Sequence, residues 1–245
     1  MRLIASAVVH NEADRYLLPW LRHLLTFCDE VRLLDDYSTD GTFEIAREHE
    51  GVEIKRSDGP AFFENESVAR NALLAWTIEG QPTHVLAIDA DEFVGDTVAL
   101  RASLAMNPSP VYSLVMREAW KIRDHQLGLR VDGLWGDRRC PLLWAAPPRL
   151  SSSWRIPNKK LACGREPQRV RSQRGYVTGV GVYHFGWTRV AEREARAERY
   201  FEHDGGRYHA NAHLQSILWP DEKVKFNWVA WPPSIPEEAA RAALA

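Results

Sequence analysis

The first 110 residues alternate between short apolar runs and longer stretches in which apolar residues recur every three or four positions. The short runs have the length of buried strands, and the longer stretches have the spacing of amphipathic helices. Strands are predicted at residues 3–9, 31–34, 52–56 and 84–88. Helices are predicted at residues 17–27, 41–50, 65–78 and 97–106. Repeated strand–helix units favour an α/β fold with a mainly parallel sheet covered by helices.

Several helix starts carry the side chains that usually cap them. Ser38, Thr39 or Asp40 is expected to cap the second helix, with Gly41 in its first turn. Asp96 is expected to cap the helix at residues 97–106, and Asn65 or Ser67 the one before it.

The pattern changes after Pro108. Residues 111–122 predict one long strand, and residues 128–146 alternate around turn residues as in an antiparallel hairpin. The next stretch, to residue 179, is irregular and rich in Pro, Ser, Arg and Lys. A charged helix is predicted at residues 190–201 and a loose helix in the tail from Trp231. With no repeat and no clear linker, we expect one domain over residues 1–245, with a Rossmann-like first part.

Three acidic residues follow the strand at 84–88 within four positions: Asp89, Asp91 and Glu92. Along an extended chain Asp89 and Asp91 point to the same side. In open α/β sheets ligands bind at the carboxyl ends of the strands. A pair of acids there can hold a hard divalent cation together with substrate phosphates. The alternative is a strand that simply leaves the core into a polar loop.

Composition narrows the class of protein. Apolar residues make up 45% and charged residues 26% of the chain, which is typical of a soluble globular protein. No apolar run approaches the roughly 20 residues of a membrane helix. The apolar N-terminus leads directly into charged sequence, as in a first strand rather than a signal peptide. Cys28, Cys140 and Cys163 form no metal motif and no even disulfide set, so a reducing cytoplasm fits best.

Charge and tryptophan are distributed unevenly. Residues 1–110 contain 9 Lys/Arg and 19 Asp/Glu, a net of −10, whereas the rest contains 22 and 14, a net of +8. Eight of the ten tryptophans lie between Trp120 and Trp231. These differences predict that the acidic part binds a cation and the basic, aromatic part a polar or anionic partner.

Four segments in order, NEADRYLLPWLRHLL, VRLLDDYSTDGTFEIA, ARNALL and LAIDADEFV, resemble the GT-A glycosyltransferases of family 2. The resemblance covers roughly residues 3–110, and no Walker or dinucleotide glycine loop is present. It implies a GT-A fold, a divalent metal (Mn²⁺ or Mg²⁺) and transfer from a nucleotide-sugar, expected to be UDP-linked, to a saccharide or other hydroxyl acceptor with inversion. Residues 1–110 would form the nucleotide-sugar-binding half and residues 111–245 the acceptor-binding half.

The resemblance also assigns residues to the nucleotide. Asp36 would receive the uracil N–H, with a turn cap as its alternative role. Val9, His10 and Glu12 would flank the nucleobase. Arg70 matches an arginine near the pyrophosphate, a contact that a guanidinium suits, although a surface salt bridge would also explain it.

Asp89 and Asp91 match the DxD element of the family. Asp91 would ligate the metal directly, and Asp89 would contact ribose or a metal-bound water, with Ala90 between them against the donor. The segment VYHFGW contains His184, which resembles the late histidine that completes the metal site; neutral imidazole is a good Mn²⁺ ligand. Glu92 faces the acceptor or pairs with a basic residue.

The catalytic base is not identified by a motif. An inverting transfer needs a carboxylate that takes the acceptor's proton. Asp124, Asp132 and Asp137 lie where the base is expected, and Asp137 is the prediction. Some tryptophans would stack on sugar faces while others fill the core. The candidates for stacking are Trp120, Trp135, Trp144, Trp154 and Trp187.

Two other functions compete with the transferase. A phosphatase of the haloacid dehalogenase type would need its DxD element on an early strand. A non-catalytic sugar-binding or nucleic-acid-binding module would suit the basic, aromatic second half. Against nucleic acid, the basic residues are scattered and the acidic pocket would repel phosphate unless a metal were present, so no nucleic-acid partner is expected.

Overall fold

The computed structural model describes residues 1–122, 126–132, 135–160, 163–204, 215–227 and 234–244. The strands are β1 Leu3–Val9, β2 Glu30–Asp35, β3 Val52–Arg56, β4 His84–Ala87, β5 Glu92–Val94, β6 Val111–Ile122, β7 Gln126–Arg130, β8 Arg138–Ala145, β9 Tyr176–His184 and β10 Phe226–Asn227. The helices are α1 Leu17–Leu25, α2 Thr42–Arg47, α3 Ala61–Glu64, α4 Glu66–Glu79, α5 Thr97–Met106, α6 Gln168–Arg171, α7 Val190–Asp204 and α9 Glu237–Leu244. Short 3₁₀ turns are η3 Ser152–Trp154, η4 Ser216–Leu218 and η5 Asp221–Lys223.

The described strands form one mixed sheet in the order β10-β7-β6-β8-β4-β1-β2-β3, with β9 paired to both β6 and β5. The strands β1, β2, β3 and β4 are parallel, and the pairing turns antiparallel from β4 to β8 onward. Val9 pairs with Asp35 and Ser6 with Ala87. The carboxyl ends of β1, β2 and β4 therefore meet at one edge of the sheet.

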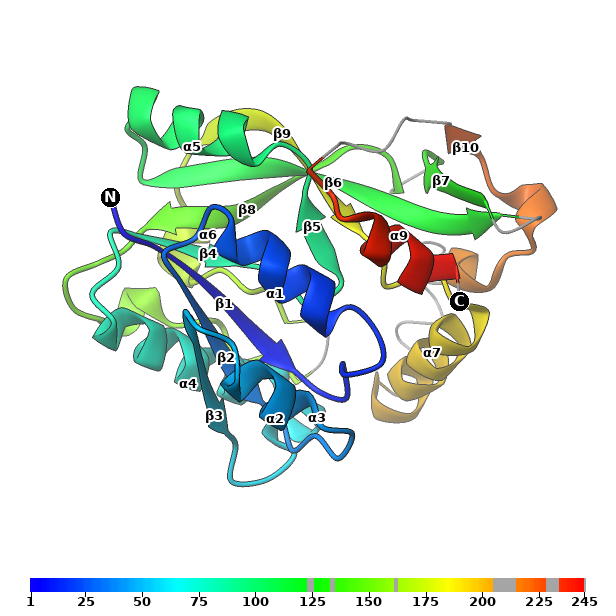
Figure 1. Ribbon diagram of the computed structural model, residues 1–245, viewed down its shortest axis with the longest axis horizontal. Coiled ribbons are helices and arrows are strands. Elements are labelled where there is room, and N and C mark those ends of the chain that lie inside the picture. The colour runs from blue at the N-terminus through cyan, green and yellow to red at the C-terminus, as the bar shows by residue number, and fades with distance from the viewer. Residues whose placement is uncertain (123–125, 133–134, 161–162, 205–214, 228–233, 245) are drawn as a thin grey trace.

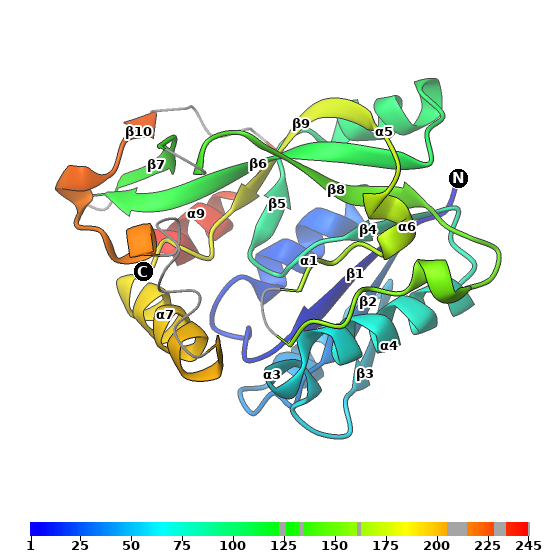
Figure 2. The ribbon, with the colours of Figure 1, turned by 180° about the vertical axis from the view of Figure 1, so that it is seen from behind.

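Helices cover both faces of the sheet. Figure 1 shows α1 and α9 in front of it, and Figure 2, seen from behind, shows α4 and α6 on the other face. The inner face of α1 buries Leu17, Trp20, Leu21 and Leu24, as its helical spacing predicts. Among the described residues, no helix is long and apolar enough to cross a membrane.

Local signals predicted the first half well. Asn65 caps α4 by accepting the Ser67 N–H, and Asp96 caps α5 by accepting the Ala99 N–H, so both predictions are confirmed. The cap of α2 differs from expectation: it is Gly41, at φ 91°, a left-handed conformation that glycine adopts without strain. The predicted α/β architecture with a mostly parallel first part is confirmed.

The predicted hairpin at residues 128–146 is wrong. The strands β7 and β8 do not pair with each other; β7 pairs with the last residues of β6, β8 pairs with its first part, and β8 also pairs with β4. Sequence alternation identified the two strands but could not identify their partners. The pairing of β9 with β5 was not predicted either.

Candidate functional site

A pocket of about 590 Å³ lies where β1 and β4 end, and α7 borders it. Its lining comes from both halves of the chain. The lining residues are Val8, Val9, His10, Glu12, Arg15, Phe62, Arg70, Asp89, Ala90, Asp91, His184, Glu192, Ala195, Arg196, Arg199 and Glu202. A second cavity of about 610 Å³, beside β3, contains none of the predicted site residues.

The predicted acidic element closes a turn between β4 and β5 rather than extending a strand. The Glu92 N–H donates to the Asp89 carbonyl at 3.0 Å. Asp89 and Asp91 nevertheless both line the pocket, with side chains 35% and 10% exposed. The turn therefore places both carboxylates in the same cavity, although the chain there is not extended as predicted.

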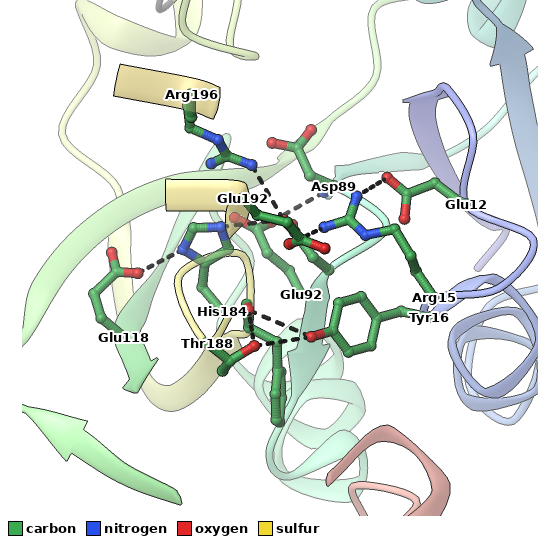
Figure 3. Close-up of polar contacts among 12 residues, drawn as sticks. Glu12, Arg15, Tyr16, Asp89, Glu92, Glu118, His184, Thr188, Glu192 and Arg196 are labelled. Carbon is green, nitrogen blue, oxygen red and sulfur yellow. Dashed lines mark hydrogen bonds and ion pairs between the residues drawn. The ribbon is translucent and has the colours of Figure 1, made fainter. Parts of the chain in front are cut away.

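His184 lies between two carboxylates. Its Nε2 is 3.4 Å from Asp91 Oδ2, and its Nδ1 is 2.5 Å from Glu118 Oε2 (Figure 3). The parallel pairing of β6 with β9 places Glu118 opposite His184. Glu118 was not predicted, because its role depends on a strand pairing between residues far apart in sequence.

The charges in this cluster depend on one another. Burial opposes ionisation of Asp91, but His184 and then Arg196 outweigh it and hold the pKa of Asp91 well below its usual range. Burial would likewise lower the pKa of His184, but Asp91 and Glu118 raise it well above its usual value. Without a metal, His184 is therefore a cation between two anions.

The Asp89 carboxylate forms ion pairs with two arginines. Arg70 Nη1 lies 3.4 Å from Asp89 Oδ1, and Arg165 Nη1 lies 3.2 Å from Asp89 Oδ2. Arg165 also pairs with the buried carboxylate of Glu92. Of the two roles weighed for Glu92, the structure thus shows the pairing with a basic residue.

The end of β1 contributes Val9 to the pocket, and the loop after it contributes His10 and Glu12. His10 Nδ1 lies 2.7 Å from the carbonyl oxygen of Asp36. Glu12 Oε1 accepts from Arg15, whereas its buried Oε2 has no hydrogen-bond partner among the described residues. Burial raises the pKa of Glu12 to about 8.

Asp36 is fully buried and does not line the pocket. Its Oδ1 accepts the Phe62 N–H at 2.9 Å and lies 3.4 Å from Ser57 Oγ. Phe62 itself lines the pocket. The carboxylate thus anchors α3 beside the cavity, and its contact with a nucleobase stays a prediction.

Two of the three candidates for the catalytic base lie away from this pocket. Asp137 has a side chain 63% exposed and lies 3.5 Å from Arg117. Asp132 accepts from the buried Arg130 at 2.7 Å. Asp124 lies outside the described residues. Neither Asp132 nor Asp137 lines the pocket, and the assignment of Asp137 as the base stays a prediction.

Most of the tryptophans proposed to stack on sugars lie in the core. Trp120, Trp135, Trp144 and Trp187 are each less than a tenth exposed. Trp154 is partly buried and lines a separate cavity of about 450 Å³ between α4 and the segment after β8.

Sequence reasoning missed the contribution of α7. Glu192, Arg196 and Arg199 recur at helical spacing and all line the pocket. The only signal was this spacing within a charged helix, which equally fits a solvated face. Only the folded structure shows that this face of α7 borders the pocket.

The cluster around Asp91 fits a divalent metal with two protein ligands. Asp91 Oδ1 is buried and has no hydrogen-bond partner among the described residues. Glu118 pairs with Nδ1 of His184, the ring nitrogen that does not face Asp91, as carboxylates commonly do for metal-ligating histidines. A Cβ on Gly186 would collide with Asp91 Oδ2 and lie 2.6 Å from His184 Nε2, so glycine keeps this space open. The part of the chain described here contains no group of three or more His, Cys, Asp or Glu able to hold a metal, so phosphates and water would complete the shell.

Comparison with known proteins places the fold. No family model matches the chain. Uncharacterized proteins of Mycobacterium tuberculosis (Rv3786c) and Mycobacterium bovis (Mb3815c) are each 30% identical over 213 residues, or 83% of this chain. The chain spans about half the length of these curated relatives (51%). The crystal structure of S. aureus TarS 1-349 matches 89% of this chain and 69% of its own with a TM-score of 0.50 and 16% identity. The chain has a GT-A glycosyltransferase-like fold, and the predicted fold class is confirmed.

Proposed function

We propose that the chain is a glycosyltransferase that moves a sugar from a nucleotide-sugar, expected to be UDP-linked, to a hydroxyl of a saccharide acceptor with inversion. The observation that carries the proposal is the pocket at the strand ends, where Asp91 faces His184 and one Asp91 oxygen is buried without a partner among the described residues. The GT-A fold and the DADE segment support the same reading.

The residues of the pocket have separate roles in this proposal. Arg70 binds the diphosphate, for which its position beside Asp89 is suitable. Glu118 fixes the His184 ring so that Nε2 faces Asp91. Mn²⁺ or Mg²⁺ held by Asp91 and His184 would neutralise charge on the leaving diphosphate. Val9, His10 and Glu12 border the donor on the β1 side.

The acceptor hydroxyl must lose its proton to a carboxylate. Asp137 is the sequence-based candidate, although it is exposed and outside the pocket. Glu12 lines the pocket with a buried oxygen, and a pKa of about 8 would let it exchange a proton near neutral pH. Both are proposed for this role.

The test is substitution of Asp91 by Asn, which removes the anionic ligand and nearly preserves volume. Calorimetry with UDP and Mn²⁺ should show loss of metal-dependent binding, and turnover of a panel of nucleotide-sugars should fall by about 10²- to 10³-fold. Asp14→Asn, an exposed acid in the loop after β1, is the matched control. Unchanged binding by folded Asp91→Asn protein would remove the metal assignment.

The same assay distinguishes the candidate bases and the non-catalytic alternative. Glu12→Gln or Asp137→Asn should abolish transfer while nucleotide binding persists, and the variant that does so identifies the base. Wild-type protein that binds nucleotide-sugars but turns none over would instead support a sugar-binding module.

A further inference from the structure

Arg196 brings a cation from the second half of the chain to the acidic turn of the first. Its Nη2 lies 3.7 Å from Asp91 Oδ2, and its guanidinium stacks on Trp187 with 4.5 Å to the ring centroid. In Figure 3 Arg196 and Arg15 approach this turn from different sides. Trp187 also contacts the ring of His184, so the support of Arg196 and the proposed metal ligand belong to one local unit.

Two ion pairs fix α7 on either side of Arg196. Arg15 Nη2 lies 2.6 Å from Glu192 Oε2, which joins α7 to the segment after β1. Arg199 Nη2 lies 3.3 Å from Glu66 Oε1, which joins it to the start of α4. Residues 192, 196 and 199 share one helix face, so these pairs hold the Arg196 side chain toward the pocket.

The contact with Asp91 does not satisfy Arg196. A distance of 3.7 Å is too long for a hydrogen bond. Among the described residues the Arg196 guanidinium donates no hydrogen bond, and 30% of its side chain is exposed in the pocket region. A guanidinium stacked on an aromatic ring and free to donate is well arranged for a phosphate.

We propose that Arg196 is a catalytic residue that binds the diphosphate of the donor and stabilises its negative charge as it leaves. This rests on the proposed function. In the transfer, the acceptor oxygen forms a bond to the anomeric carbon while the bond from that carbon to the phosphate oxygen breaks. The electron pair of the broken bond goes to the phosphate oxygen beside Arg196, and the acceptor's proton goes to the base carboxylate. Arg70 and Arg196 thus contact the diphosphate from the two halves of the chain.

The experiment measures UDP and UMP binding by calorimetry, in EDTA and in Mn²⁺, for wild type, Arg196→Met and Arg196→Lys. Arg196→Met should weaken UDP by about 10- to 100-fold, because a charged hydrogen bond is lost, and change UMP little. The loss should persist in EDTA, which separates it from metal binding. Arg196→Lys should restore part of the affinity. Arg47→Met, which removes an exposed arginine on α2, is the control for net charge.

The outcomes separate this proposal from the function on which it rests. Wild-type protein that binds UDP, with Arg196→Met binding equally well, would leave Arg196 only a structural contact of Trp187. Equal losses for UDP and UMP would also overturn the diphosphate contact. Wild-type protein that binds neither UDP nor the diphosphates of the other nucleosides would overturn both the transferase and this role. All variants are first compared with wild type by unfolding temperature.

Discussion

The two halves of the chain hold their charged groups in different ways. In residues 1–110, the buried carboxylates at the end of β2 accept main-chain donors: Asp36 accepts the Phe62 N–H, and Asp35 accepts the Ser38 N–H together with Arg56 Nε. In the second half, guanidinium groups lie on tryptophan rings. Arg130 stacks on Trp120 and Trp135 at 4.5 and 4.7 Å.

Contacts between the two halves account for part of the charge asymmetry. Cations of the second half approach acids of the first: Arg165 pairs with Asp89, Arg199 with Glu66, and Arg196 lies near Asp91. The net charges of −10 and +8 therefore meet within the molecule. The sequence suggested two separate external partners, but ion pairs between the halves also require such a split. The division into donor and acceptor halves stays a prediction.

The largest effect on stability is expected from the buried tryptophans of the second half. Trp135 is 3% exposed, and its Nε1 donates to Ser216 Oγ at 2.7 Å. Trp135→Ala should cost about 3–5 kcal/mol of unfolding free energy, because it leaves a cavity and unpacks Arg130. Trp154→Ala, at a partly buried ring, should cost about 1 kcal/mol. Denaturant unfolding measures both values.

Folded Trp154→Ala protein then tests the division of roles. If the second half binds acceptor, this variant should lose transfer but keep slow donor hydrolysis, which needs only the donor pocket and a water. Equal loss of both activities would mean that Trp154 supports the donor site instead. A Trp135→Ala protein as stable as wild type would show that the tryptophan–arginine cluster is not structural.

The two halves also differ in their buried histidines: Asp91 and Glu118 hold His184 of the second half as a cation, whereas burial keeps His23 of the first half neutral. His23 Nε2 accepts the Val94 N–H at 3.1 Å. Burial lowers its pKa from 6.5 to about 4. Below pH 6.5 His23 binds a proton in the unfolded chain but stays neutral in the folded protein until about pH 4. About 3 kcal/mol of unfolding free energy is therefore lost between pH 6.5 and 4.

His23→Gln is the matched variant, since its amide oxygen can accept the same N–H but cannot titrate. Its stability should change less with pH over this window than that of wild type. Parallel curves for the two proteins would mean that other groups dominate acid unfolding.

Features that depend on neighbouring residues were predictable from sequence. The bounds of β1, β3 and α5 match the predicted segments, because apolar period and capping side chains are local signals. The resemblance likewise identified the GT-A fold, since its motifs lie at the ends of those local elements.

Features that depend on distant pairing were not predictable. Glu118 reaches His184 through the β6–β9 register, across 66 positions of sequence. The hairpin prediction failed for the same reason, because alternation marks a strand but not its partner. Arg165 and Arg196 sit in an irregular segment and a charged helix, where nothing local shows which carboxylate each one approaches.

Ligand binding, rather than stability, tests the proposed contact of Asp36 with the nucleobase in the first half. Asp36→Ala should weaken uridine nucleotides by about 1–3 kcal/mol if the carboxylate meets the uracil N–H, while binding of the metal survives. The same change also leaves the Phe62 N–H without its acceptor, so α3 beside the pocket is disturbed. Ser57→Ala is the control, because it removes a side chain near Asp36 Oδ1 and leaves the carboxylate in place. Calorimetry with UDP, ADP and GDP distinguishes the roles. A loss confined to UDP supports base recognition, whereas equal losses, or none, mean that Asp36 serves only to hold the turn and α3.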